Sequence, residues 1–218
     1  MTILAFLGGT GDQGKGLARR YALAGHEVVL GSRSAERAAA AATEVANSVP
    51  GGAVVRGGTN AEAAAAGEFV VAAVPYEGHA SLLADLAEPL AGKILIDCVN
   101  PLGFDERGAF GLDVPEGSAA EQAAALLPHT TVVAAFHHVS AVLLLDPAVD
   151  IVETDVLVLG DDRAATDAVQ ALVGEIKGMR GIYAGRLRNS RQVEALTANL
   201  ISVNRRYKAH AGLRVTDV

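Results

Sequence analysis

Cysteine is nearly absent from this chain of 218 residues, in which Cys98 is the single example. One thiol excludes an internal disulfide and a metal site built from several cysteines, and it favours a reducing, cytoplasmic compartment. Basic residues are outnumbered, with 18 Lys and Arg against 25 Asp and Glu and a net charge of −7. This acidic balance argues against nonspecific binding to nucleic acid or to an anionic membrane.

Other features that define large protein classes are also missing. The chain has no run of about 18 apolar residues, so we expect no membrane span, and its first residues lack the basic segment of a signal peptide. The six histidines include no pair at helical i, i+4 spacing beside a glutamate, so we expect no zinc or other metal site. The serine hydrolase motif G-x-S-x-G is absent too.

Short apolar runs alternate with helical stretches along the chain, half of whose residues are hydrophobic. We expect strands near residues 2–7, 27–31, 53–56, 69–74, 93–97, 130–135, 154–159 and 180–185. We expect helices near 12–24, 34–47, 59–66, 78–90, 118–127, 163–175 and 189–209. Strands rich in Val, Ile and Leu that are separated by helices predict a doubly wound α/β fold of the Rossmann type, with a mainly parallel sheet and helices on both faces.

The chain is expected to consist of a large and a small part. Residues 1–160 would form the sheet domain, and residues 161–218 a small helix and strand extension that packs on it and completes its pocket. Residues 100–117 predict a long loop, and loops of that length are usually functional or mobile. The last helix would pack against the sheet domain or against a second copy of it.

A glycine-rich turn follows the first predicted strand. Its sequence GTGDQG matches G-x-G-x-x-G and opens a helix within the first βαβ unit, as a dinucleotide fingerprint requires. Gly9 allows the tight turn, Gly11 lets the backbone approach a pyrophosphate, and Gly14 lets the helix pack close to the strand. A turn without a ligand is the alternative. The residues expected at the dinucleotide are Gly9, Thr10, Gly11, Asp12, Gln13 and Gly14.

The residues after the second predicted strand indicate which dinucleotide is bound. A NAD site places an acidic residue there, about 20 residues after the glycines, to bind the ribose hydroxyls. This chain has Ser32 and Arg33 instead, followed by Arg37 one helical turn later. A hydroxyl and two guanidinium groups suit a 2′-phosphate, so we expect NADP(H). Alternatively, Ser32 only caps a helix and the arginines form a solvated face.

The exits of the later strands are expected to carry the other half of the site, because ligands of such sheets lie across the carboxyl edge. The fourth strand ends in Val74, Pro75 and Tyr76, which would form the wall behind a nicotinamide. The fifth is followed by Asn100 and Pro101, which would shape the opposite side.

Two neighbouring histidines, His137 and His138, follow the sixth strand. Adjacent side chains diverge, so we expect at most one of them to point into the pocket, where it would bind an anion or donate a hydrogen bond to a substrate. A packed or surface pair is the alternative. The strand exits otherwise offer no evident acid–base pair, and hydride transfer to a flavin-like ring needs mainly alignment and exclusion of water.

Four segments together resemble one family. They are LGGTGDQGKGLA, the GSR after the second strand, the VP at the end of the fourth, and AGRLRNSRQVEALT at 184–197. The combination is similar to the NADPH-dependent coenzyme F(420) reductases, also called F(420)H2:NADP+ oxidoreductases, from residue 3 to about 213. The resemblance implies reversible hydride transfer between C4 of NADP(H) and C5 of the 8-hydroxy-5-deazaflavin coenzyme F(420), without a catalytic side chain.

The resemblance also implies roles for individual residues. The glycine turn with Ser32 and Arg33 would hold NADP(H), and His137 would line the deazaflavin side. Ser190 would lie near the interface between the sheet domain and the last helix, where we expect substrate contact. The family is typically homodimeric. Alternatives are an NADPH-dependent reductase of a flavin, ferric chelate, quinone or imine, and a protein that senses NADPH without turnover.

Overall fold

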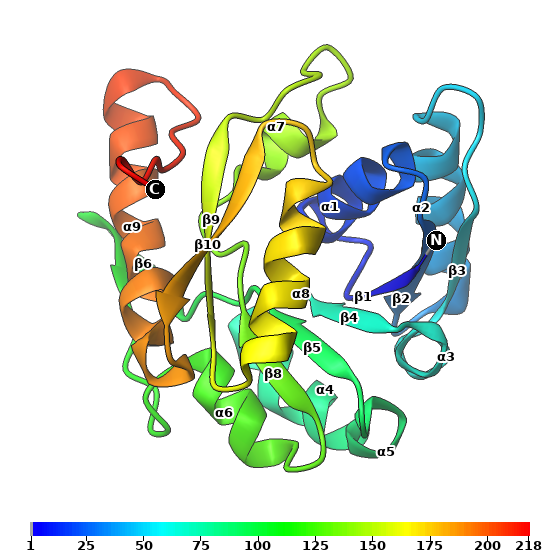
Figure 1. Ribbon diagram of the computed structural model, residues 1–218, viewed down its shortest axis with the longest axis horizontal. Helices are drawn as coiled ribbons and strands as arrows, with labels where there is room; N and C mark the ends of the chain where they lie inside the picture. The colour runs from blue at the N-terminus through cyan, green and yellow to red at the C-terminus, as the bar shows by residue number, and fades with distance from the viewer. Residues whose placement is uncertain (1) are drawn as a thin grey trace.

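Eight apolar runs form a single sheet in the computed structural model, which describes residues 2–218 (Figure 1). The strand order is β10-β9-β8-β5-β4-β1-β2-β3. The bounds are β1 Ile3–Leu7, β2 Glu27–Ser32, β3 Val55–Thr59, β4 Phe69–Ala72, β5 Ile94–Asp97, β8 Thr131–Ala134, β9 Thr154–Gly160 and β10 Met179–Gly185. From β3 to β8 all neighbours are parallel, in the Rossmann order. The predicted fold class is confirmed.

The last two strands run in the opposite direction. β9 meets β8 in antiparallel fashion only at Val133↔Gly160 and Ala134↔Leu159, and β10 then runs parallel to β9. Because only the carboxyl-terminal ends of β8 and β9 overlap, the first half of β9 extends past the edge at which the parallel strands end. It forms a side wall at the edge where ligands of such sheets bind.

Helices cover both faces of the sheet (Figure 1). On one face, Leu17 and Tyr21 of α1 pack with Phe6 and Val71 of the strands. On the other, helices α3 to α6 and the start of α9 pack on the alternate strand residues, Leu95 among them. Burying one such side chain contributes about 1.5–3 kcal/mol. The bounds are α1 Asp12–Leu23, α2 Ala35–Asn47, α3 Asn60–Ala66, α4 His79–Asp85, α5 Ala87–Leu90, α6 Ala119–Leu126, α7 Ala141–Leu145, α8 Arg163–Gly174 and α9 Ser190–Tyr207.

Two predicted elements are wrong in part. Residues 100–117 were expected as a loop but contain a β-hairpin, made of β6 (Leu102–Asp105) and β7 (Gly108–Gly111). The helix expected over 78–90 is broken into α4 and α5. Pro89 accounts for the break, because proline has no N–H to donate and its ring clashes with the carbonyl four residues earlier, at the end of α4.

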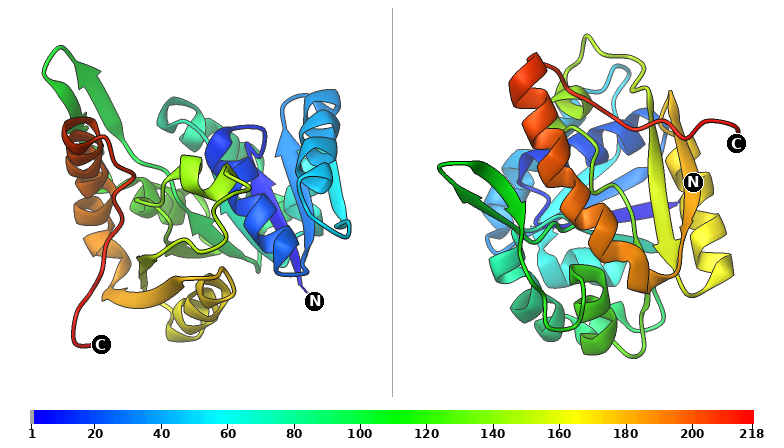
Figure 2. Two further views of the ribbon diagram at one scale, coloured as in Figure 1. Left: turned by 90° about the horizontal axis from the view of Figure 1, so that it is seen from above. Right: turned by 90° about the vertical axis from the view of Figure 1, so that its left-hand side faces the viewer.

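The long helix α9 stands beside the hairpin, at the side of the molecule opposite β3 (Figure 2). Its Val193 is buried in the core of the second sheet face. The carboxylate of the next residue, Glu194, accepts hydrogen bonds from the backbone N–H groups of Ala119 and Ala120 at 3.0 and 3.2 Å. Glu194 thereby supplies acceptors to the amino end of α6, whose first N–H groups have no partner within the helix.

The carboxyl-terminal tail runs along the first half of β9, where β8 does not reach. The carbonyl of Leu213 accepts a hydrogen bond from the N–H of Asp155 at 2.8 Å. The Asp155 carboxylate is fully buried and accepts from Arg180 at 2.6 and 2.7 Å and from Arg214 at 3.0 Å. The tail thus takes the place of a missing neighbouring strand and is fixed by ion pairs. No helix within residues 2–218 combines the length and apolarity needed to cross a membrane.

Candidate functional site

The turn between β1 and α1 is built on close backbone contacts that exclude side chains. Gly8 has φ +67°, and a Cβ there would collide with Cγ1 of Val74 and stand 2.8 Å from the carbonyl of Ala73. A Cβ on Gly14 would stand 2.8 Å from Cα of Gly9. The turn is also held from outside, since the Gly8 N–H donates to Oδ1 of Asn60 at 3.1 Å. The backbone therefore lies close to both the helix and the exit of β4.

The amino end of α1 has no side-chain cap. Gly11 is the N-cap residue in an extended conformation, and it has no side chain with which to accept from the first turn. Asp12 and Gln13 are the first two helical residues. The N–H groups of such an end carry partial positive charge and are suited to a phosphate. The geometry fits the dinucleotide that the sequence motif predicts.

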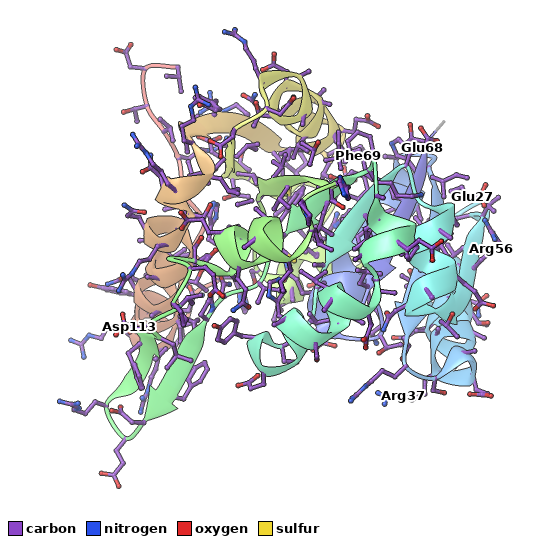
Figure 3. All side chains as sticks on the ribbon, turned by 90° about the horizontal axis from the view of Figure 1, so that it is seen from below. Glu27, Arg37, Arg56, Glu68, Phe69 and Asp113 are labelled. Carbon is purple, nitrogen blue, oxygen red and sulfur yellow. The ribbon has the colours of Figure 1, made fainter. Side chains whose placement is uncertain are left out.

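The end of β2 presents the hydroxyl and the guanidinium groups. Ser32 is the last strand residue, while Arg33 is exposed directly after it. The cap of α2 is Ser34, whose Oγ accepts from the Arg37 N–H at 3.3 Å, so the alternative interpretation of Ser32 as a helix cap is wrong. Figure 3 shows Arg37 projecting at the end of the sheet opposite Glu27 and Arg56.

One cleft of about 590 Å³ joins these elements. It lies along the carboxyl edge of the sheet, from the end of β2 across the glycine turn to the exit of β4. Of the residues predicted from the sequence, it brings together Thr10, Gly11, Ser32, Arg33, Arg37, Val74 and Pro75. Asn60, Gly78, Ser81 and Asp85 also line it. The cleft therefore combines a positively charged end, a backbone turn and an apolar wall.

The remaining predicted residues of the β4 and β5 exits lie beside the cleft. Tyr76 begins a short 3-10 helix (Tyr76–Gly78), and its ring centroid lies 6.4 Å from that of His79. Asn100 donates from Nδ2 to the carbonyl of His137 at 2.7 Å. Pro101 lines a second, smaller cleft of about 260 Å³ between the hairpin and α9. The two clefts lie on either side of the β5 exit.

His137 is buried, with 4% of its surface exposed. Its carbonyl accepts from Asn100 and from Thr197 of α9 at 3.0 Å, which joins the exits of β5 and β8 to the last helix. Both ring nitrogens are buried without a hydrogen-bond partner. Burial lowers the pKa of His137 to about 4, so the ring is neutral at pH 7. A neutral imidazole with free nitrogens can both donate and accept.

His138 points toward β9, away from the cleft. Its Nε2 lies 3.5 Å from the N–H of Leu157, on the stretch of β9 that β8 does not reach. Burial lowers its pKa to about 4 as well. The two side chains diverge, and neither lines the 590 Å³ cleft. Phe136, directly before them, has φ 64°, a conformation that costs a bulky residue roughly 1–3 kcal/mol.

Ser190 is fully buried at the first position of α9, and its Oγ has no hydrogen-bond partner. It is one of several buried polar atoms without a partner, which include both ring nitrogens of His137, Oδ1 of Asn100 and Nδ1 of His138. Arg191 next to it pairs with Asp113 at 2.6 Å, and Figure 3 shows Asp113 beside α9, across the molecule from Arg37. Within residues 2–218, no three His, Cys, Asp or Glu side chains gather as a metal site would require.

Comparison with known proteins identifies the family. The family model described as "NADP oxidoreductase coenzyme F(420)-dependent" matches residues 3–101. The F(420)-dependent NADP reductase of Methanothermobacter marburgensis is 42% identical over 99% of this chain and 98% of its own length. That of Methanocaldococcus jannaschii is 39% identical over 99% and 98%. This chain belongs to the F(420)-dependent NADP reductase family.

A solved structure agrees with this assignment. A crystal structure from Arthrobacter sp. FB24, of a protein provisionally named an F(420)-dependent NADP reductase, is 30% identical to this chain. It superposes with a TM-score of 0.82, and the match covers 99% of each chain. The similarity to an F(420)-dependent NADP reductase therefore extends through the hairpin and α9, beyond the segment that the family model matches.

Sequence reasoning did not find the contacts of three polar residues around the cleft of this reductase. Asn60 holds the glycine turn, and the buried pair His79 and Asp97 lies behind the exits of β4 and β5. Each is a single residue outside any motif, and its partner is 18 or more positions away. No local pattern could have indicated these contacts, since the fold alone brings the partners together.

Proposed function

We propose that this protein transfers hydride reversibly between NADP(H) and the deazaflavin coenzyme F(420), as the names of its full-length relatives describe. One observation supports the dinucleotide half most strongly. A single cleft contains an uncapped helix end, a hydroxyl with two arginines at one extremity, and an apolar strand exit at the other. From one extremity to the other, the arginines, the helix end and the strand exit match the 2′-phosphate, the pyrophosphate and the nicotinamide of one extended molecule.

The roles of the binding residues follow from their chemistry. The N–H groups at the start of α1 would bind the pyrophosphate, and Arg33 with Arg37 would bind the 2′-phosphate. A NAD site would instead carry an acidic residue after β2 for the ribose hydroxyls. When bound, the nicotinamide exchanges a hydride at C4 and the deazaflavin exchanges it at C5. Val74 and Pro75 would press against the nicotinamide ring and keep water from it.

The deazaflavin side is supported by buried polar groups without partners. The neutral ring of His137 and the Oγ of Ser190 both have unfilled hydrogen-bonding capacity. Such groups cost free energy unless a ligand or water satisfies them. We assign both to contacts with the second coenzyme, with Asn100 holding the His137 backbone in place. His138 would support the site indirectly, through its contact with β9.

We also propose a cytoplasmic homodimer. The hairpin and the end of α9 expose large apolar side chains, among them Phe104 at 69% and Tyr207 at 73%. A second copy of the chain would cover this surface. A light-scattering mass twice that of the 22.3 kDa chain is the expected result.

The decisive experiment mixes the protein with NADPH and oxidised coenzyme F(420) and follows the loss of the deazaflavin's visible absorbance. FMN, FAD and a ferric chelate serve as alternative acceptors, and NADH replaces NADPH in a parallel series. Rapid bleaching with NADPH and the deazaflavin alone is the expected result. Tight NADPH binding without oxidation by any acceptor would favour a sensor, and turnover of a flavin or chelate alone would favour another reductase.

A further inference from the structure

A buried histidine–aspartate pair lies directly behind the cleft. His79 is the first residue of α4 and Asp97 the last residue of β5, and both side chains are completely buried. The distance from His79 Nε2 to Asp97 Oδ2 is 2.7 Å. Neither residue contacts the cleft surface itself, although Gly78, which precedes His79, lines it.

Asp97 occupies the centre of the carboxyl edge of the sheet. Its backbone pairs with Ala72 at the end of β4 and with Ala134 at the end of β8. Its second carboxylate oxygen, Oδ1, accepts from the N–H of Val99 at 2.9 Å and so fixes the first residues after β5. One carboxylate therefore holds the β5 exit with one oxygen and α4 with the other.

His79 transmits this contact to the β4 exit. His79 begins α4 and directly follows the segment from Val74 to Gly78. Its ring lies beside the ring of Tyr76, with a distance of 6.4 Å between the ring centroids. Val74 and Pro75 in that segment form the apolar wall of the cleft. The pair thus ties the wall to the neighbouring strand exit.

The hydrogen bonds around His79 favour its protonated form. Gln122 donates from Nε2 to Glu116 at 3.1 Å, which leaves its Oε1 facing His79 Nδ1 at 3.3 Å. Both ring nitrogens then face acceptor oxygens, an arrangement that favours a hydrogen on each. Burial alone would lower the pKa of His79, but the charge and hydrogen bond of Asp97, with smaller effects from Gln122 and Glu194, raise it above its ordinary value.

A buried ion pair is a poor means of gaining stability. Removing two charges from water costs about as much as their attraction returns, and apolar residues of similar volume often stabilise as well. Such a pair does, however, impose a fixed distance and direction on the two elements that carry it. At this place the two elements are the walls of a site whose chemistry depends on alignment.

We propose that His79 and Asp97 are positioning residues for hydride transfer, which lock the β4 exit against the β5 exit and so set the place of the nicotinamide ring. The inference rests on the proposed function, because it assigns the nicotinamide to the Val74 and Pro75 wall. The pair touches neither coenzyme; it acts through the backbone of the two strand exits.

The test compares three variants with the wild type. His79→Gln and Asp97→Asn remove the ion pair, and Asp97→Asn keeps an acceptor for Val99 and is the milder change for folding. His26→Gln is the matched control, since His26 is also buried and paired with a carboxylate, Glu175, but lies before β2 at the opposite end of the sheet. Thermal unfolding, the Kd for NADPH, kcat and the primary deuterium isotope effect with C4-labelled NADPH are measured for each.

We expect kcat to fall about 10- to 100-fold in His79→Gln and in Asp97→Asn, because small misplacements of reacting groups slow a reaction by this much. The Kd for NADPH should stay within about threefold, because the phosphates that dominate binding lie at the far end of the cleft. The isotope effect should rise, because hydride transfer then becomes the step that limits turnover. His26→Gln should lose stability but keep the wild-type kcat. An unchanged kcat in folded Asp97→Asn, or an equal loss in His26→Gln, overturns the proposal.

Failure of the proposed function would be visible separately, as a wild type that does not reduce the deazaflavin. The fluorescence of bound NADPH then tests the pair without any acceptor. An emission spectrum altered in Asp97→Asn and unaltered in His26→Gln would support the positioning role. Identical spectra in all proteins would overturn it.

Discussion

Arg33 is the single side chain on which the choice of dinucleotide depends most. It stands exposed directly after β2, in the position where NAD-binding proteins carry an acid, and it lines the cleft. Replacing Arg33 by Ala should weaken NADPH binding by about 1–3 kcal/mol, the usual loss for a charge-assisted hydrogen bond. Binding of NADH should change little, because it lacks the phosphate.

Titration of both dinucleotides by fluorescence measures this difference. Arg56→Ala is the matched control, since Arg56 is a partly exposed arginine on the adjacent strand β3 that pairs with Glu27 at the other end of the sheet. NADPH affinity should be unchanged in the control. Equal NADPH affinity in Arg33→Ala and the wild type would show that Arg33 does not bind the 2′-phosphate.

At the residue scale, local spacing was informative where a motif sets the geometry. A Cβ on Gly9 or Gly14 would come within 3.0 Å of neighbouring backbone atoms, so a sequence pattern suffices to place these two glycines. A Cβ on Gly11 would meet nothing nearer than 3.7 Å, which leaves room there for a ligand. The pair His79 and Asp97 could not be found in this way. Its two members belong to different βα units, and only the adjacency of β4 and β5 brings them within 2.7 Å.

At the scale of elements, the contact between α9 and α6 depends on one carboxyl group. Burial raises the pKa of Glu194 to about 7, although two backbone N–H groups donate to it. Its pKa in the unfolded chain is about 4.3. The folded state therefore binds the proton more tightly, and this contribution to stability is complete below about pH 4 and is lost as the pH rises to about 7.

We expect Glu194→Gln to remove a pH dependence of about 3 kcal/mol in the free energy of unfolding. His137 and His138, whose pKa values burial lowers to about 4, act in the opposite direction below about pH 6.5. The difference between variant and wild type isolates Glu194. Urea unfolding from pH 5 to pH 8 provides the measurement.

The exposed Glu44, which pairs with Lys15, supplies the control. Glu44→Gln should follow the wild type at every pH. If the stability difference between Glu194→Gln and the wild type were constant from pH 5 to pH 8, the buried carboxyl would not titrate as described, and the joint between α9 and α6 would not respond to pH.

The order of strands and helices could largely be predicted, because period and composition are local properties. The hairpin at 100–117 was missed although its turn carries a signal. Asp105 accepts from the N–H groups of Arg107 and Gly108, the arrangement that Asp followed three residues later by Gly favours. The direction of β9 could not be predicted, since an apolar run has the same pattern in either direction.

At the scale of the whole molecule, the carboxyl-terminal tail is bound to the edge of β9. Asp155 is buried under Arg180 and Arg214, and these bonds lower its pKa. A lowered pKa in the folded state means that the stabilisation is present above about pH 4 and is lost as the pH falls further. Asp155→Asn should release residues 210–218 and lower stability by about 1–3 kcal/mol.

Hydrogen exchange over residues 210–218, together with thermal unfolding, provides the check. Asp167→Asn is the control, because Asp167 makes two exposed contacts, an i, i+4 pair with Arg163 and a hydrogen bond from Gln170, and such surface contacts contribute little. Protection of the tail amides that persisted in Asp155→Asn would mean that the backbone bond between Leu213 and Asp155 holds the tail without the ion pairs.

The contact of Gly8 with Val74 separates two tasks that protein engineers often wish to change independently. Because a side chain at Gly8 would collide with Val74, the glycine turn between β1 and α1 and the end of β4 are packed together as one rigid unit. Arg33 and Arg37 lie outside that unit, at the exposed end of the cleft. Replacing these two arginines alone should therefore shift the coenzyme preference from NADPH to NADH. The face of the nicotinamide ring that meets the acceptor should stay the same.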